Sequence, residues 1–240
     1  MPGRSPAKKT LPLLERGTDL SRIVAFTDGV FAIAITLLVL QIDVPTNATS
    51  ASDLIEKLAD QSPDFTAFGV SFIVIGAFWI SNHRFMRTVR EFDRGLMLLL
   101  LPYLGIMVLI PFTSQLMGEY SDQFDVAVLF YVMNMALMAL MAYFMDAHVL
   151  RRGLARAEYE WDVDLTRKSS LFTTAVFVAT APLVFVFGPW TPLLWFSLRW
   201  DPYQRRRDRA YRQSAGDPSR EDSPADADRR EAVDDTAPGE

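Results

Sequence analysis

Half of the 240 residues are hydrophobic and the mean hydropathy is +0.13. The apolar residues form long blocks, a pattern that excludes an ordinary soluble domain and indicates a small polytopic membrane protein. The net charge of −5 says little about partners, because a large share of the acidic residues lies in the last forty positions. The absence of cysteine excludes disulfides, thiolate catalysis and cysteine metal sites, and the presence of only two histidines disfavours a histidine metal centre.

Five apolar segments are long enough to cross a membrane, since a hydrocarbon core of about 30 Å needs about twenty apolar residues in a helix. A sixth candidate, Trp190–Trp200, is about half that length, contains Pro192 and follows Gly188-Pro189. It is a short span, a re-entrant piece or an interfacial helix. The five longer segments are Ile23–Val44, Phe65–Asn82, Leu96–Met117, Val126–Phe144 and Leu171–Phe187.

Loops with several basic residues alternate along the chain with loops that have one or none. This pattern follows the positive-inside rule for six spans with both termini in the cytoplasm, and it favours a true sixth crossing. We therefore expect an all-α membrane protein with six transmembrane helices per chain. The basic groups are Lys8, Lys9, Arg16 and Arg22; Arg84, Arg87, Arg90 and Arg94; Arg151, Arg152, Arg156, Arg167 and Lys168; and Arg199, Arg205, Arg206 and Arg207.

The two ends differ in composition from the rest of the chain. Residues 1–18 and 201–240 are too polar to bury a core of their own, which predicts disordered cytoplasmic ends. The transmembrane domain is then expected to comprise residues 19–200.

The first apolar segment contains an acid, Asp28. A carboxylate inside a membrane helix costs about 2.5 kcal/mol or more, so we expect Arg22 or a neighbouring helix to provide a partner. Asp28 either fixes helix packing through an ion pair or hydrogen bond, or contacts a permeating ion.

Further along this segment, Ile33, Leu37 and Leu40 recur on one stripe of a helix, with Thr36 beside them. Periodicity alone does not distinguish a pore lining from a stripe that faces lipid or the protein core.

The run Arg22-x-x-x-Phe26-Thr27-Asp28 resembles the Arg-x-x-x-Phe-Ser-Asp signature of the transmembrane protein 175 family, the endosomal and lysosomal potassium channels and their bacterial relatives. Thr27 replaces the usual serine and keeps its hydroxyl. The resemblance extends over roughly residues 18–200. Further matching stretches are Phe78-Trp79-Ile-Ser-Asn82-His83, Ile110-Pro111-Phe112 and Gly118-Glu119-Tyr120.

This resemblance implies a bacterial single-repeat member that assembles as a homotetramer. Its first helices would line a central pore without a re-entrant carbonyl selectivity filter. Ile33 would form the narrowest ring, Leu37 and Leu40 further rings, and Thr36 a polar layer.

The resemblance also implies a buried polar network that couples the pore helix to its neighbours. An interfacial aromatic belt is the alternative for Trp79, and a position at head-group level is the alternative for His83. The expected members of the network are Arg22, Phe26, Thr27, Asp28, Trp79, Asn82 and His83.

The function implied is a potassium-permeable cation channel, modestly selective over sodium, because a hydrophobic ring passes more readily the ions that lose water at lower cost. The expected partners are other copies of the chain, the lipid bilayer and permeating monovalent cations, not nucleic acid. The expected location is a bacterial inner or plasma membrane. No catalytic set, cofactor or metal site other than permeant potassium is expected.

Two alternatives remain. A small secondary transporter would need internal ionisable groups in more than one span, and Asp28 is the only acid expected deep in an apolar run. A non-conducting scaffold would use the same motif only to hold helices together. His148 is expected at the surface of a basic loop.

Overall fold

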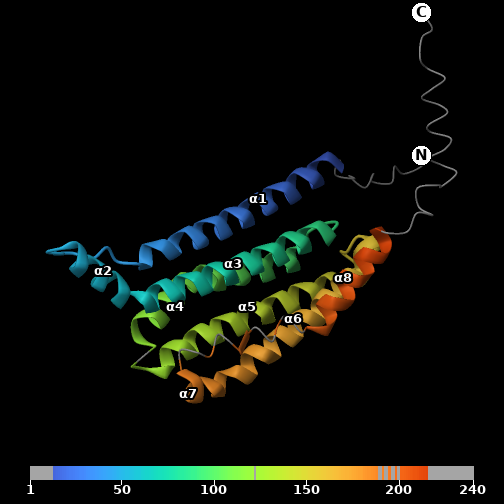
Figure 1. Cartoon of the computed structure of the whole chain (residues 1–240). Helices are drawn as coiled ribbons and strands as arrows, with labels where there is room; N and C mark the ends of the chain where they lie inside the picture. The colour runs from blue at the N-terminus through green and yellow to red at the C-terminus, as the bar shows by residue number, and fades with distance from the viewer. Residues whose placement is uncertain are drawn as a thin grey trace, which may run out of the picture.

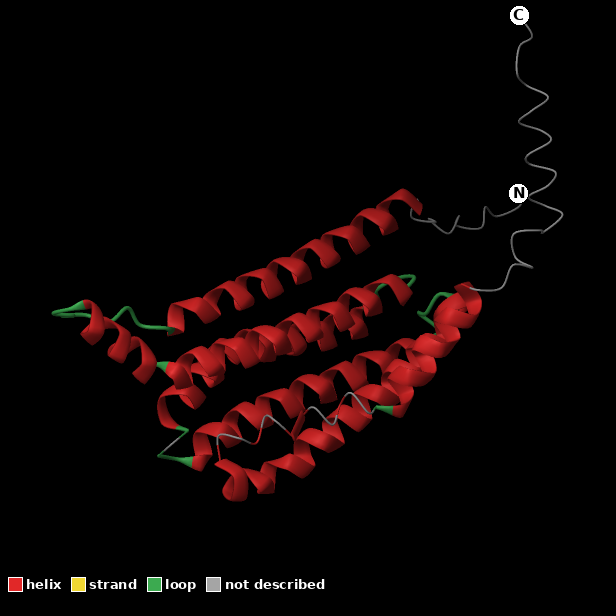
Figure 2. Cartoon of the chain, in the orientation of Figure 1, coloured by secondary structure: helices red, strands yellow, loops and turns green. Residues whose placement is uncertain are grey.

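The computed structural model describes residues 13–121, 123–188 and 201–215, together with Thr191, Leu194, Trp195 and Leu198. These described residues form helices and no strand (Figure 2). The elements are α1 (Leu13–Leu37), η1 (Leu38–Gln41), α2 (Ala51–Asp60), α3 (Ser62–Thr88), α4 (Arg94–Tyr120), α5 (Asp125–Arg152), η2 (Ala157–Tyr159), α6 (Glu160–Thr180), η3 (Ala181–Leu183), α7 (Val184–Phe187) and α8 (Pro202–Ala215).

Five stretches of the described chain are long and apolar enough to cross a membrane, so the protein is a multi-pass membrane protein. Each corresponds to one of the five longer segments expected from the sequence. The helices extend past the apolar runs because their polar ends, such as Arg84–Thr88 of α3, continue the same backbone hydrogen bonding. The five stretches are Leu20–Gln41, Ser62–Thr88, Arg94–Tyr120, Asp125–Arg152 and Ala157–Phe187.

The long helices run alongside one another, and α5 packs against both α4 and α6 (Figure 1). Helix α1 lies at one edge of the bundle, against α3 and α4. Helices α2 and α7 are at one end of the bundle, whereas α8 and the start of α1 are at the other.

Small polar side chains join the central helices. The Ser71 hydroxyl of α3 lies 2.7 Å from Ser114 Oγ of α4 and 2.9 Å from Tyr131 Oη of α5. Asn134 of α5 lies 3.2 Å from Thr113 Oγ1 of α4 in either orientation of its amide. Such bonds suit a lipid environment, where water cannot satisfy the polar groups.

The predicted sixth span, Trp190–Trp200, lies largely outside the described residues. Within it, Trp195 is buried, stacks on Tyr131 at 5.7 Å and meets Phe177 edge-on at 5.0 Å. Its flanking elements, α7 and α8, lie at opposite ends of the bundle (Figure 1).

Both chain ends were expected to be disordered, but the parts of them that the structure describes are helical. Residues 13–18 belong to α1, and residues 202–215 form α8. Helix α8 forms because Asp201 is a good N-cap, accepting a hydrogen bond from the Tyr203 amide at 2.8 Å, and because Arg207 is buried against α6.

Candidate pore-lining helix and its polar contacts

Helix α1 buries one face and leaves another open. Thr27, Phe31 and Ala34 are at most 2% exposed. Ile33 is 61% exposed and Leu37 is 38% exposed on the surface of the single chain. A bilayer or another copy of the chain is therefore needed to cover the Ile33 side of the helix.

The stripe continues into η1, where the α-helix tightens to a 3-10 helix. Leu40 is 73% exposed, whereas Leu38 is fully buried against the bundle. Beside the stripe, the exposed Thr36 hydroxyl donates to the carbonyl of Ile33 at 2.9 Å. Because the hydroxyl proton is donated within the helix, the Thr36 oxygen remains free only to accept a hydrogen bond or to coordinate a cation.

Two neighbours in the first-helix motif face different ways. Thr27 is fully buried and donates its hydroxyl to the carbonyl of Ile23 at 2.8 Å, a bond that serine makes equally well. Phe26 is 57% exposed. The expected network therefore includes a side chain, Phe26, that the single chain does not bury.

The partner of Asp28 comes from α3. The indole Nε1 of Trp79 donates to Asp28 Oδ1 at 3.0 Å, and the rings of Trp79 and His83 lie 5.7 Å apart. Of the two partners expected for Asp28, the structure shows the one from a neighbouring helix, while Arg22 is exposed.

Asn82 belongs to a different environment. It is 4% exposed and lines a cavity between α3, α4, α5 and α6, with its amide nitrogen buried and without a hydrogen-bond partner among the described residues. The structure thus brings together Asp28, Trp79 and His83, and it separates Asn82 from them.

His148 was expected at the surface of a basic loop, but its side chain is buried, with only 6% exposed. Its Nε2 lies 2.9 and 3.0 Å from the two carboxylate oxygens of Asp93, which also caps α4 by accepting from the Leu96 amide at 2.7 Å. A Cβ on Gly95 would lie 2.5 Å from His148 Cε1, so the close packing requires glycine. The expectation was wrong because α5 continues to Arg152 and carries His148 back into the bundle.

Asp93 lies between the membrane stretches. Partial burial raises the pKa of its carboxyl, but the Leu96 amide and the His148 side chain outweigh burial and hold the Asp93 pKa below its ordinary value.

Two further acids are buried although they lie outside the apolar runs expected from the sequence. Asp146 of α5 is 2% exposed, and Asp162 of α6 is 4% exposed. The hydroxyl of Tyr211 donates to Asp162 Oδ2 at 2.8 Å, and Arg207 Nε lies 3.9 Å from Asp162 Oδ1. Burial, followed by the neighbouring Asp162 carboxylate, raises the pKa of Tyr211 to about 12. The Asp162–Arg207 pair depends on α8, which the sequence did not predict.

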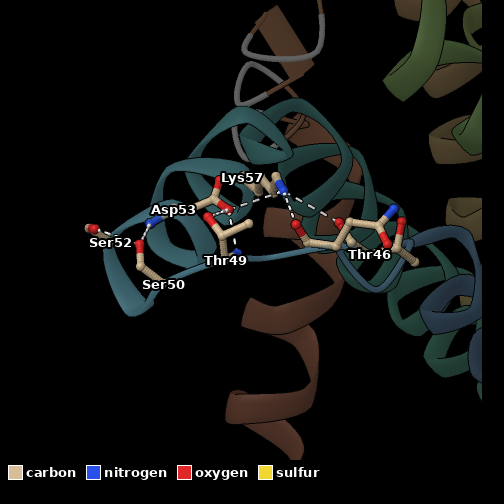
Figure 3. A network of polar contacts seen from close by, with 7 residues as sticks. Thr46, Thr49, Ser50, Ser52, Asp53 and Lys57 are labelled. Atoms are coloured by element: carbon tan, nitrogen blue, oxygen red, sulfur yellow. Dashed lines mark hydrogen bonds and ion pairs between the residues drawn. The ribbon is translucent and has the colours of Figure 1, made fainter.

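At the opposite end, polar contacts tie the loop after η1 to α2 (Figure 3). Lys57 Nζ donates to Asp53 Oδ2 at 3.3 Å and to the carbonyl of Asn47 at 3.0 Å. The Ser50 hydroxyl caps α2 by accepting from the Asp53 amide. The backbone amide and hydroxyl of Thr49, with Lys57, lower the pKa of Asp53. These contacts fix the loop that leads away from the stripe of α1.

Comparisons with known proteins show which family the chain resembles. The family described as "Endosomal/lysosomal potassium channel TMEM175" matches residues 22–111. A potassium channel of Streptomyces collinus is 39% identical over 138 residues, which cover 56% of this chain and 66% of that protein. The endosomal/lysosomal proton channel TMEM175 of Gallus gallus is 32% identical over 42% of this chain and 22% of its own length.

A solved structure shows the same architecture. The lysosomal potassium-selective channel TMEM175 homolog from Chamaesiphon minutus has a TM-score of 0.67 and 27% identity, and the match covers 79% of this chain and 98% of that one. The chain spans about half to two thirds of the length of the curated bacterial relatives it matches.

Proposed function

Because this chain is a relative of the TMEM175 family of channels, we propose that it forms a potassium-permeable cation channel. The proposal rests on the names of its relatives and on one observation: the first helix buries one side and leaves an aliphatic stripe open, within the matched residues 22–111.

In the proposed assembly, four copies place their α1 helices around a common axis. Ile33 forms the narrowest hydrophobic ring, and Leu37 and Leu40 form further rings. A ring that excludes water blocks ions until it widens, and then favours potassium modestly because potassium loses its water at lower cost than sodium. Thr36 supplies an acceptor oxygen next to the constriction.

We further propose that the channel lies in a bacterial inner or plasma membrane with both termini in the cytoplasm. The basic end that carries α8 would then face the cytoplasm, as the positive-inside rule requires. The chain acts without a cofactor or catalytic residue, and its only ligand in the pore is the permeating cation.

One observation favours a second candidate, a proton-coupled transporter. Buried acids, Asp146 and Asp162, occur on two helices other than α1, and transporters need internal ionisable groups in several spans. The channel remains the better conclusion because the relatives with matching sequences are named channels.

A recording of purified protein in a planar bilayer under a potassium/sodium gradient tests the proposal. A channel gives unitary currents with a reversal potential shifted toward that of potassium, a transporter gives saturable coupled flux without unitary steps, and a scaffold gives neither.

A substitution in the proposed gate sharpens this test. We expect Ile33→Asn to raise unitary conductance severalfold and to reduce the preference for potassium, because an amide ring holds water in the constriction. The matched control is Ile73→Asn on α3, which alters an equally open isoleucine, 70% exposed, on another helix. Unchanged currents in Ile33→Asn would remove Ile33 from the gate.

A further inference from the structure

A small cavity lies inside the bundle, lined by residues of α3, α4, α5 and α6 and none of α1. Six of its nine lining residues carry polar groups, unlike the aliphatic stripe of the proposed pore. The polar residues are Ser81, Asn82, Tyr103, Asp146, Thr166 and Ser170.

One buried atom in this cavity lacks a partner, and a buried carboxyl group beside it has a single long hydrogen bond. The buried amide nitrogen of Asn82 has a hydrogen to donate and no acceptor among the described residues. The carboxyl group of Asp146 receives one hydrogen bond, from Ser170 Oγ at 3.3 Å. Buried polar groups in native proteins are almost always satisfied, so the unpartnered Asn82 nitrogen beside a weakly bonded carboxyl group points to a bound molecule.

The charges that face Asp146 do not neutralise it. In the part of the chain that the structure describes, no cation lies within ion-pair distance of Asp146. Arg167 of α6 donates to Asp164 at 2.7 Å, and Arg207 of α8 is shared between Thr166 and Asp162. Asp162 is a further negative charge nearby. Tyr103 of α4 lines the same cavity as Asp146, and the lining residues from α3, Ser81, Asn82 and Phe85, carry no ionisable group.

The chemistry of these two groups also constrains the ligand. Asn82 offers a donor, which repels a metal cation but suits a molecule that accepts hydrogen bonds. Asp146 carries a negative charge that a buried site does not tolerate alone. Water can accept from Asn82 and donate to Asp146, but it leaves the charge in place. A proton removes that charge.

We propose that this cavity binds one water molecule and one proton. The water bridges Asn82 Nδ2 and the Asp146 carboxyl group, and the proton, taken up from bulk solvent, resides on Asp146. The site joins α3, α4, α5 and α6, and none of its lining residues belongs to α1.

Infrared difference spectroscopy of the full chain in lipid nanodiscs tests the proposal directly. We expect the wild-type protein at neutral pH to show a band from a protonated carboxyl group that shifts in D₂O. We expect Asp146→Asn, which keeps the shape of the side chain, to lose this band. Asp60→Asn, which alters an exposed acid of α2, serves as the matched control and keeps it.

Two further measurements test whether water is bound at Asn82 and whether the ligand on Asp146 is a proton or a metal cation. Asn82→Leu removes the donor, so the band is expected to persist at a shifted frequency. Exchange of potassium and sodium for a bulky organic cation at constant pH is expected to leave the band unchanged. Absence of the band in the wild-type protein, its persistence in Asp146→Asn, or a band that grows when the metal cations are removed would overturn the proposal.

Discussion

At the scale of single residues, the contact between Asp28 and Trp79 is the clearest link from α1 to the rest of the chain. A carboxylate in a membrane helix needs a donor, and the indole N–H provides one without adding a charge. We interpret Asp28 as a packing residue, because this bond points into the chain's own α3.

We therefore expect Trp79→Phe to destabilise the protein by about 1.5–3 kcal/mol, the range for a hydrogen bond to a charged group. Phenylalanine keeps an aromatic ring but removes the donor and part of the ring bulk, and the control variant shares the loss of bulk. The measurement is the thermal unfolding midpoint in detergent. The control is Trp161→Phe. Trp161 is 40% exposed, close to the 41% of Trp79, and its indole N–H donates to a local backbone carbonyl. Equal effects in the two variants would show that the Asp28 bond contributes nothing special.

Asp93 gives an expectation for pH. A carboxyl whose pKa is lower in the folded chain than its ordinary 3.8 stabilises the fold above that value, and this stabilisation disappears as the pH falls through the lowered pKa. We expect the unfolding midpoint of the wild-type protein to fall between about pH 5 and pH 3. In Asp93→Asn, which keeps a capping oxygen, the fall should be smaller. A pH profile of Asp93→Asn identical to the wild-type profile would contradict this role.

At the scale of elements, the main surprise is the docking of α8 on α6. Arg207 is 8% exposed and lies beside Asp162, while the ring of Tyr211 packs 5.3 Å from that of Trp161. The charge-rich composition of residues 201–240 predicted disorder, because it averages over a helix in which one arginine is buried and its neighbours are exposed.

We expect Arg207→Ala to release α8. Removing one partner of a buried ion pair costs about 3–5 kcal/mol, so limited trypsin digestion within α8 should accelerate more than tenfold. Arg209→Ala, which removes an exposed arginine and one cleavage site of the same helix, is the control and should digest at the wild-type rate. Similar rates for all three proteins would show that α8 does not depend on this ion pair.

At the scale of the whole molecule, five of the apolar spans and their order follow from the sequence because twenty-residue apolar blocks have few alternatives in a bilayer. The first-helix motif likewise predicted the similarity to the TMEM175 family. The interior acids could not be found this way. Asp146 and His148 follow the apolar part of their segment, and only the continuation of α5 past it buries them.

The lack of cysteine in the chain allows a direct test of the proposed tetramer. Leu40→Cys places a single thiol on each α1 stripe, near the proposed axis, and should give disulfide-linked dimers on mild oxidation in membranes. Ile73→Cys, at a comparably exposed position of α3, should give few. The readout is the dimer fraction on a non-reducing gel, and equal cross-linking at the two positions would argue against a shared axis at α1.

The tightening of α1 into η1 changes how its last aliphatic rings would be arranged. In a 3-10 helix residues three apart eclipse each other, with a rise of about 2.0 Å per residue, so Leu40 lies almost directly in line with Leu37. Relaxing the four residues of η1 to an α-helix would shorten the segment by about 2 Å and turn Leu40 by about 60° relative to Leu37. A change between 3-10 and α-helical geometry in η1 would therefore rotate the Leu40 side chain away from the line of Leu37 without moving Ile33.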